Sequence, residues 1–284
     1  MFEMFQLDFI VLAFVISILI GMLLSYLGVH VVKRGIVFVD LALGQISSLG
    51  VAFSDYVGYG KTIIPIAFAL IGALLMSFIH LRDKRIKVEA IIGIIYAVAS
   101  AATVMLISKS AHGDSDIQEV LFGNILSVDW AQISILGLIF LFIALVHFIF
   151  RKKFFELTEH FVMHDTADNG SAFKLSRSLK FWNFVFYISI GLTIVFAVRT
   201  SGVIPVFSFL IIPAVCGIML ARKNLSIVLA AVAVSLLGAF FGLNVSYHFD
   251  FPAGSSLVAV LGAIFLLVSM IYFFRNQKTE KARG

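Results

Sequence analysis

The stretch FIVLAFVISILIGMLLSYLGV, residues 9–29, contains no charged side chain. A helix rises about 1.5 Å per residue, so roughly 20 apolar residues cross the hydrocarbon core of a bilayer, and this stretch is long enough to do so. Similar runs recur along the 284 residues, of which 61% are hydrophobic and 13% are charged. The sequence therefore predicts an all-α fold, a polytopic bundle of membrane helices.

We expect about eight or nine transmembrane helices in a single domain over residues 1–284, because the longest connection, 151–180, is too short for a core of its own. The second and seventh candidate segments are short or polar enough that either can be a half-helix. With ends set to within about 2–4 residues, the candidates are 9–30, 37–54, 62–80, 89–108, 131–150, 182–198, 202–221, 225–243 and 255–274.

Lysine and arginine gather in alternate loops. With the N-terminus outside, 18 of the 21 basic residues fall in inside loops, and the exceptions are Lys61, Lys109 and Arg199. This bias predicts an N-out, C-in orientation in a cytoplasmic membrane. It also accounts for the formal net charge of +5 without a nucleic-acid partner.

Polar side chains interrupt the segment 37–54. On a helix, Asp40, Gly44, Ser47 and Ser48 share one face, with Gln45 beside it. Polar groups inside a bilayer usually face the interior of the bundle or a water-filled path, because unpaired they cost several kcal/mol. We therefore interpret Asp40, Gln45, Ser47 and Ser48 as candidates for a translocation path.

Two alternatives remain for this face. Gly44, Ser48 and Ala52 recur every four residues, a spacing that also suits close packing of helices through small residues. Asp40 could instead lie near the inner interface and pair with Lys33 or Arg34.

The loop ELTEHFVMHDTAD, residues 156–168, carries acidic residues and two histidines. His160 and His164 are four residues apart, so one metal ion could contact both on a helix. A solvated amphipathic helix that docks a partner explains the same residues better. The candidates for docking are Glu159, His164, Asp165 and Asp168.

Two further segments have alternative interpretations. Pro205 and Pro213 fall in one span, which is typical either of an ordinary kink or of a helix broken at mid-membrane. His248 and Asp250, in an outer loop, could attract cations at a gate, although Asp250 also begins a turn into the last span.

Catalysis has little support in the sequence. No HExxH motif and no Ser–His–Asp pattern stands out, so a membrane-embedded enzyme is the rival class. Gly60-Lys61-Thr62 ends like a phosphate-binding loop, but Asp55 replaces the first glycine of that motif. If ATP drives transport, another chain must hydrolyse it.

Five stretches, in order, resemble the permease subunit of metal-ion ABC importers of the zinc, manganese and iron type, over about Gly28 to Gly262. Those stretches are VVKRGIVFVDLALGQISSLGVAFS (31–54), VEAIIGIIYAVASAATVMLIS (88–108), LFGNILSV (121–128), SGVIPVFSFLIIPAVCGIML (201–220) and VSYHFDFPAGSSLV (245–258). The resemblance implies a transport subunit of the bacterial cytoplasmic membrane that moves a divalent metal and has no covalent cofactor.

The resemblance implies that an aspartate and a histidine hold the metal, both in the helix that corresponds to residues 37–54. Alignment on Gly50-Val51-Ala52 puts Leu41 at the aspartate place and Gln45 at the histidine place. Asp40 is one residue early, about 100° around the helix. The metal ligands are therefore left unassigned, and the same scaffold carrying a metal complex or another small solute is the alternative.

The resemblance also implies partners. Two permease copies would form the pathway, cytoplasmic ATPases would dock on the loop 151–180, and an extracytoplasmic binding protein would deliver the substrate.

Overall fold

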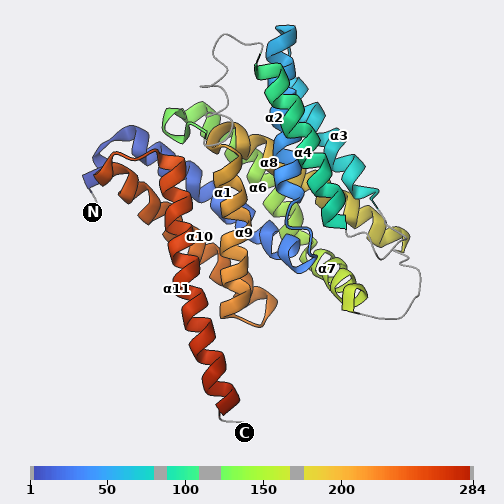
Figure 1. The fold of residues 1–284 in the computed structure, drawn as a ribbon, viewed down its shortest axis with the longest axis vertical. Helices are drawn as coiled ribbons and strands as arrows, with labels where there is room; N and C mark the ends of the chain where they lie inside the picture. The colour runs from blue at the N-terminus through green and yellow to red at the C-terminus, as the bar shows by residue number, and fades with distance from the viewer. Residues whose placement is uncertain (1–2, 80–87, 109–122, 167–175, 282–284) are drawn as a thin grey trace. The chain divides into compact units, whose positions relative to one another are not determined.

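The computed structural model describes residues 3–79, 88–108, 123–166 and 176–281, with only the backbone at residue 3, 164–166 and 276–281 (Figure 1). Within these ranges all regular structure is helical. The elements are η1 (Glu3–Gln6), α1 (Asp8–Lys33), α2 (Val39–Val57), α3 (Ile63–Ser77), α4 (Val88–Ile107), η2 (Ile125–Ser127), α6 (Trp130–Ile149), α7 (Arg151–Thr166), α8 (Arg177–Ser201), α9 (Val203–Leu220), α10 (Asn224–Phe249) and α11 (Ala253–Lys281).

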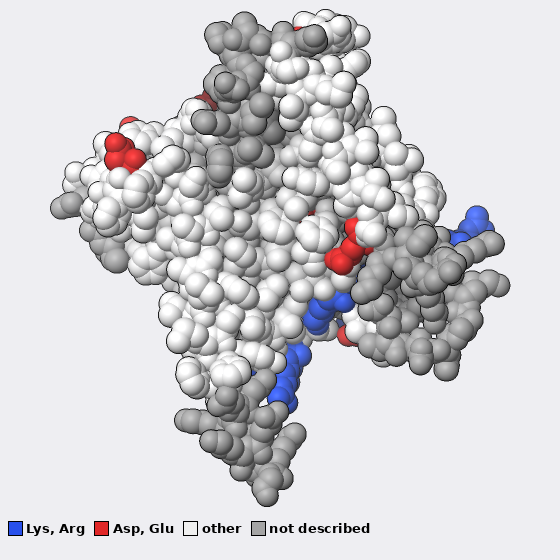
Figure 2. All heavy atoms as spheres, in the orientation of Figure 1, with Lys and Arg blue, Asp and Glu red and all other residues white. Residues whose placement is uncertain are grey.

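Seven of the described helices are long and apolar enough to cross a membrane: α1, α4, α6, α8, α9, α10 and α11. The predicted polytopic helical bundle is therefore confirmed. All nine candidate segments form helices, but α2 is more polar than the seven, and the 15 residues of α3 rise only about 22 Å. On the face shown in Figure 2, most of the described surface is uncharged, as a lipid-facing surface should be.

The chain packs as two compact units. The α2 unit contains residues 33–123 and 138–203, and the α10 unit contains residues 1–32, 124–137 and 204–284. In the α2 unit, α2 packs against α3, α4 and α8, α3 packs against α8, and α7 lies on α8. Gly50 permits the close approach of α2 to α3, since a Cβ there would lie 2.8 Å from the Cα of Pro65.

Small residues also bring the helices of the α10 unit together. A Cβ on Gly28 of α1 would overlap the carbonyl of Leu210 in α9. A Cβ on Gly242 of α10 would lie 2.8 Å from the Cα of Leu257 in α11. Close approach through glycine favours van der Waals packing between apolar helices, which gain little from the hydrophobic effect inside a bilayer.

The two prolines do not break the predicted span 202–221. Pro205 lies in the first turn of α9, where a missing N–H costs nothing, and Pro213 lies inside a helix that continues to Leu220. The interruption is at Gly202, whose φ of 79° ends α8 one residue before α9 begins. The structure therefore favours a continuous helix with an internal proline over a half-helix.

Candidate translocation path and docking helix

The polar residues of α2 are buried, as a path or a packed interface requires. Asp40 is 2% exposed and Gln45 is 5% exposed, and Ser47 and Ser48 are also buried. Leu41, which follows Asp40, is half-buried. Four neighbouring polar side chains on one helix are thus withdrawn from the surface.

Asp40 lies in the first turn of α2 without a side-chain partner among the described residues. No described donor makes a hydrogen bond to either carboxylate oxygen, and only the N–H groups of Asp40 itself and of Leu41 act on this carboxylate. Asp40 therefore does not pair with Lys33 or Arg34, which was one of the two alternatives. A buried carboxylate without a cation is costly, so it is available for one.

The face that carries Asp40 is directed toward the end of α8. A Cβ on Gly44 would lie 3.5 Å from Val203 and 3.6 Å from Val198, at ordinary van der Waals distance. Ser48 donates to the carbonyl of Gly44 at 3.0 Å and so satisfies itself within its helix. The Oγ of Ser47 is buried and makes no hydrogen bond within the described chain. Packing accounts for Gly44 and Ser48, but not for Asp40 or Ser47.

Helix α7 is amphipathic, as its sequence predicts. Phe154, Leu157 and Thr158 are buried, and Leu157 packs against Leu179 of α8. The ring of His147, near the end of α6, stacks on Phe154 with centroids 3.9 Å apart. The helix is thus attached along one face, and its opposite face is open.

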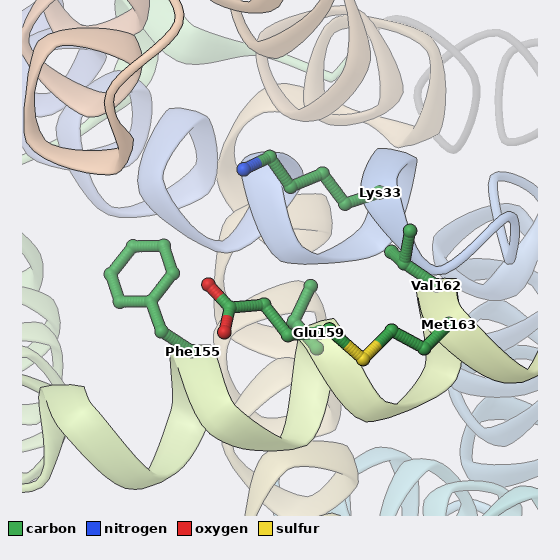
Figure 3. Close-up of a pocket in the computed structure, with 6 residues that line it drawn as sticks. Lys33, Phe155, Glu159, Val162 and Met163 are labelled. Carbon is green, nitrogen blue, oxygen red and sulfur yellow. The ribbon is translucent and has the colours of Figure 1, made fainter.

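The exposed face of α7 borders a shallow pocket of about 270 Å³. Its lining residues are Lys33, Phe155, Thr158, Glu159, Val162 and Met163. Figure 3 shows the carboxylate of Glu159 directed toward the helix that carries Lys33, and the two charges attract. The pocket therefore combines an apolar floor with one charge of each sign.

The other predicted docking residues are only partly covered by the structure. His164 and Asp165 belong to the last turn of α7, where the structure describes the backbone and not the side chains. Asp168 lies outside the described residues. His160 is half-buried. Where side chains are described, no three His, Cys, Asp or Glu residues come together to hold a metal ion.

The predicted outer residues lie at a turn between α10 and α11. Asp250 ends α10 with a φ of 53°, in the left-handed region, and its N–H donates to Ser246 O. Ser246 Oγ donates to the carbonyl of Phe251 at 2.7 Å and closes the turn. His248 is exposed beside Tyr247. The turn interpretation is confirmed, and a gate role for His248 and Asp250 stays a prediction.

Sequence reasoning missed three polar residues that meet in the α2 unit. Arg34, between α1 and α2, donates to Thr158 of α7 and to Asn183 of α8. The residues are 124 and 149 positions apart in the chain, so no local pattern could join them. The only signal was an arginine placed on the same side of the membrane as the loop 151–180.

Comparison with known proteins agrees with this architecture. The model of the ABC 3 transport family matches residues 6–272. The manganese transport system membrane protein MntC of Listeria monocytogenes is 28% identical over 266 residues, which cover 92% of this chain and 90% of that protein. The chelated iron transport system membrane protein YfeD of Yersinia pestis is 25% identical over 270 residues, which cover 95% and 87%.

A solved structure has the same fold. PsaBC from Streptococcus pneumoniae, in complex with Fab, superposes with a TM-score of 0.75 at 25% identity and covers 93% of this chain and 91% of that chain. The chain belongs to the ABC 3 transport family. It is a multi-pass membrane permease, so the predicted resemblance is confirmed and the membrane-embedded enzyme is the wrong class. Its family implies an ATP-binding subunit and a substrate-binding protein as partners.

Proposed function

We propose that this permease belongs to a bacterial ABC importer for a divalent metal ion, with manganese as the first candidate. The relatives named for manganese and for chelated iron support a metal cargo. A metal chelate is the alternative cargo, because Leu41 and Gln45 occupy the places of the family's two ligands.

The observation that carries the proposal is the buried polar face of α2. Within the described chain no side chain bonds to the carboxylate of Asp40 or to the hydroxyl of Ser47, and oxygen ligands of this kind suit hard cations such as Mn²⁺. Gln45 is five residues from Asp40, about 140° around the helix, so the two side chains act at different points of the path.

The assembly that we propose follows the family. Two copies of the permease form the path in the cytoplasmic membrane. ATPase subunits dock on the loop 151–180, through Glu159, His164, Asp165 and Asp168. A binding protein delivers the substrate at the outer turn that carries His248 and Asp250.

The test is the metal content of cells that lack this chain. Growth at limiting manganese, iron, zinc and cobalt, followed by elemental analysis, should show a selective deficit of one metal, and the wild-type gene should restore the content of that metal.

Variants of α2 test the path. Genes with Asp40→Asn or Gln45→Ala should restore the metal content at least about 5-fold less well, since each removes a polar contact with the cargo worth about 1 kcal/mol or more. Asp55→Asn is the control, because Asp55 is exposed in a 3.6 Å ion pair with Lys61.

Two results would contradict these assignments separately. If no metal differs between the strains, the cargo is a different solute. If a metal deficit is found but both α2 variants restore it fully, the path does not follow this face.

A further inference from the structure

Arg34 connects the chain ahead of α2 to the docking helix by hydrogen bonds. Its Nε donates to Oγ1 of Thr158 in α7 at 3.1 Å, and its Nη1 donates to Oδ1 of Asn183 in α8 at 3.4 Å. All three residues belong to the α2 unit. One rigid guanidinium thus contacts two helices through two different nitrogens, a planar geometry that the single nitrogen of a lysine does not have.

Aromatic rings fix the plane of the same guanidinium. Cζ of Arg34 lies 3.8 Å from the ring centroid of Phe186 in α8 and 5.5 Å from that of Phe161 in α7. Both distances are within the range of a cation–π interaction. The side chain is half-buried, which strengthens this attraction compared with an exposed pair.

The two hydrogen-bond acceptors are themselves held in place. Oγ1 of Thr158 donates to the carbonyl of Phe154 at 2.9 Å, so its position follows α7. Nδ2 of Asn183 donates to the carbonyl of Ser77, the last residue of α3, at 3.5 Å. A displacement of α7 therefore acts on Arg34 directly, against a support made by α3 and α8.

The loop 34–38, which begins with Arg34, also makes a hydrogen bond to α4 just before α2 begins. The N–H of Val37 donates to Oε1 of Glu89, in the first turn of α4, at 3.2 Å. Between the hydrogen bonds of Arg34 and that of Val37, Gly35 has a φ of 66°, a conformation that suits glycine. Helix α2 begins at Val39, and Asp40 follows in its first turn. Only five residues, 35–39, separate Arg34, whose guanidinium contacts α7, from Asp40 at the start of the polar face.

We infer that Arg34 is a positioning residue that transmits a displacement of α7 to the start of α2. This inference rests on the proposed function, because it takes α7 as the docking helix of the ATPase and α2 as a wall of the path. Its role is coupling: ATP hydrolysis continues without Arg34, but it moves less substrate.

The main experiment uses the full complex of permease, ATPase and binding protein in proteoliposomes, with Mn²⁺ as the probe. Complex yield, ATPase rate and Mn²⁺ uptake are measured for Arg34→Lys, Thr158→Val and Thr158→Ser. We expect Arg34→Lys and Thr158→Val to lower uptake per ATP by about 5-fold at unchanged yield. Thr158→Ser should keep wild-type coupling because it keeps the hydroxyl. Arg199→Lys, an exposed arginine of α8, is the matched control.

A double variant separates this hydrogen bond from general damage. Arg34→Lys combined with Thr158→Val should be no worse than Arg34→Lys alone, since both remove the same bond. Unchanged uptake per ATP in the single variants would overturn the inference. A fall in complex yield that accounts for the whole loss of uptake would overturn it too, because Arg34 would then only hold the fold.

A second measurement does not depend on the cargo. In a chain with Cys216→Ser and Ser47→Cys, the rate of labelling by a small thiol reagent is compared with and without ATP in the assembled complex. We expect an ATP-dependent change of about 5-fold or more that Arg34→Lys abolishes. A change that persists in Arg34→Lys, or no change with Arg34 present, would contradict transmission to α2. If Mn²⁺ uptake is absent but this change follows Arg34, the metal assignment fails and the inference stands.

Discussion

At the scale of single residues, Gly28 is a position where no other side chain fits. An added Cβ would meet the backbone carbonyl of Leu210, which cannot rotate away as a side chain does. Gly28→Ala should therefore force α1 and α9 apart and lower the free energy of unfolding by about 1–3 kcal/mol. Thermal unfolding of the purified permease in detergent measures this loss as a lower midpoint.

Gly93 of α4 is the control for this substitution. A Cβ there has no heavy atom within 4 Å, so Gly93→Ala should leave the midpoint unchanged or raise it, since alanine is the better helix former by about 1 kcal/mol. Equal midpoints for Gly28→Ala and Gly93→Ala would show that α1 and α9 are not packed this closely.

The residues of the candidate path show how far a sequence can be interpreted. Burial of Asp40, Gln45, Ser47 and Ser48 was predictable, because polar residues in an apolar helix must leave the lipid. Their partners were not predictable, because pairing depends on which helices meet. Arg34 illustrates this limit, since an alternative from sequence paired it with Asp40 whereas it bonds to Thr158 and Asn183.

At the scale of elements, α7 packs along one face and exposes the other, to which we assign the ATPase. Leu157 is fully buried, so Leu157→Ala should leave a cavity, cost about 2–5 kcal/mol and lower the amount of folded permease. Glu159 is exposed, and we expect that replacing Glu159, Asp165 and Asp168 by their amides lowers ATPase association, since it removes the acidic groups assigned to docking. Expression level and co-purification of the ATPase measure the two effects.

Asp129→Asn is the control for charge, because Asp129 is exposed and accepts from the N–H of Gln132 at the start of α6, a bond that asparagine can keep. Normal association of the ATPase with the triple amide variant would mean that docking uses another surface. Loss of folded protein in that variant would mean that these acids stabilise α7 itself.

Elements were more predictable than their interruptions. Apolar length and loop charge predicted all nine candidate segments, since the bilayer imposes a minimum helix length. The predicted spans 182–198 and 202–221 placed the boundary correctly, since α8 ends at Ser201 and α9 begins at Val203. Whether Pro205 and Pro213 break the second span was left open, and the structure keeps that span as one helix.

At the scale of the whole molecule, the number of crossings decides where each loop lies. Seven helices meet the length and composition of a span, and α2 and α3 would raise the number to nine. Both numbers, counted over the described residues, are odd, so either count agrees with the predicted N-out, C-in orientation. The loop between α2 and α3, which contains Tyr59, is the part of the chain that distinguishes the two topologies.

Cysteine labelling tests the orientation and this loop together. Cys216 is buried and can be replaced by alanine, and cysteines then replace Tyr59, Phe251 or Lys153, all exposed. If the basic loops are inside and α3 crosses, a membrane-impermeant maleimide should label Tyr59→Cys and Phe251→Cys in intact cells, and Lys153→Cys only after permeabilisation. The reverse pattern would contradict N-out, C-in. Labelling at Phe251→Cys but not at Tyr59→Cys would mean that α2 and α3 form a hairpin that enters the membrane without crossing it.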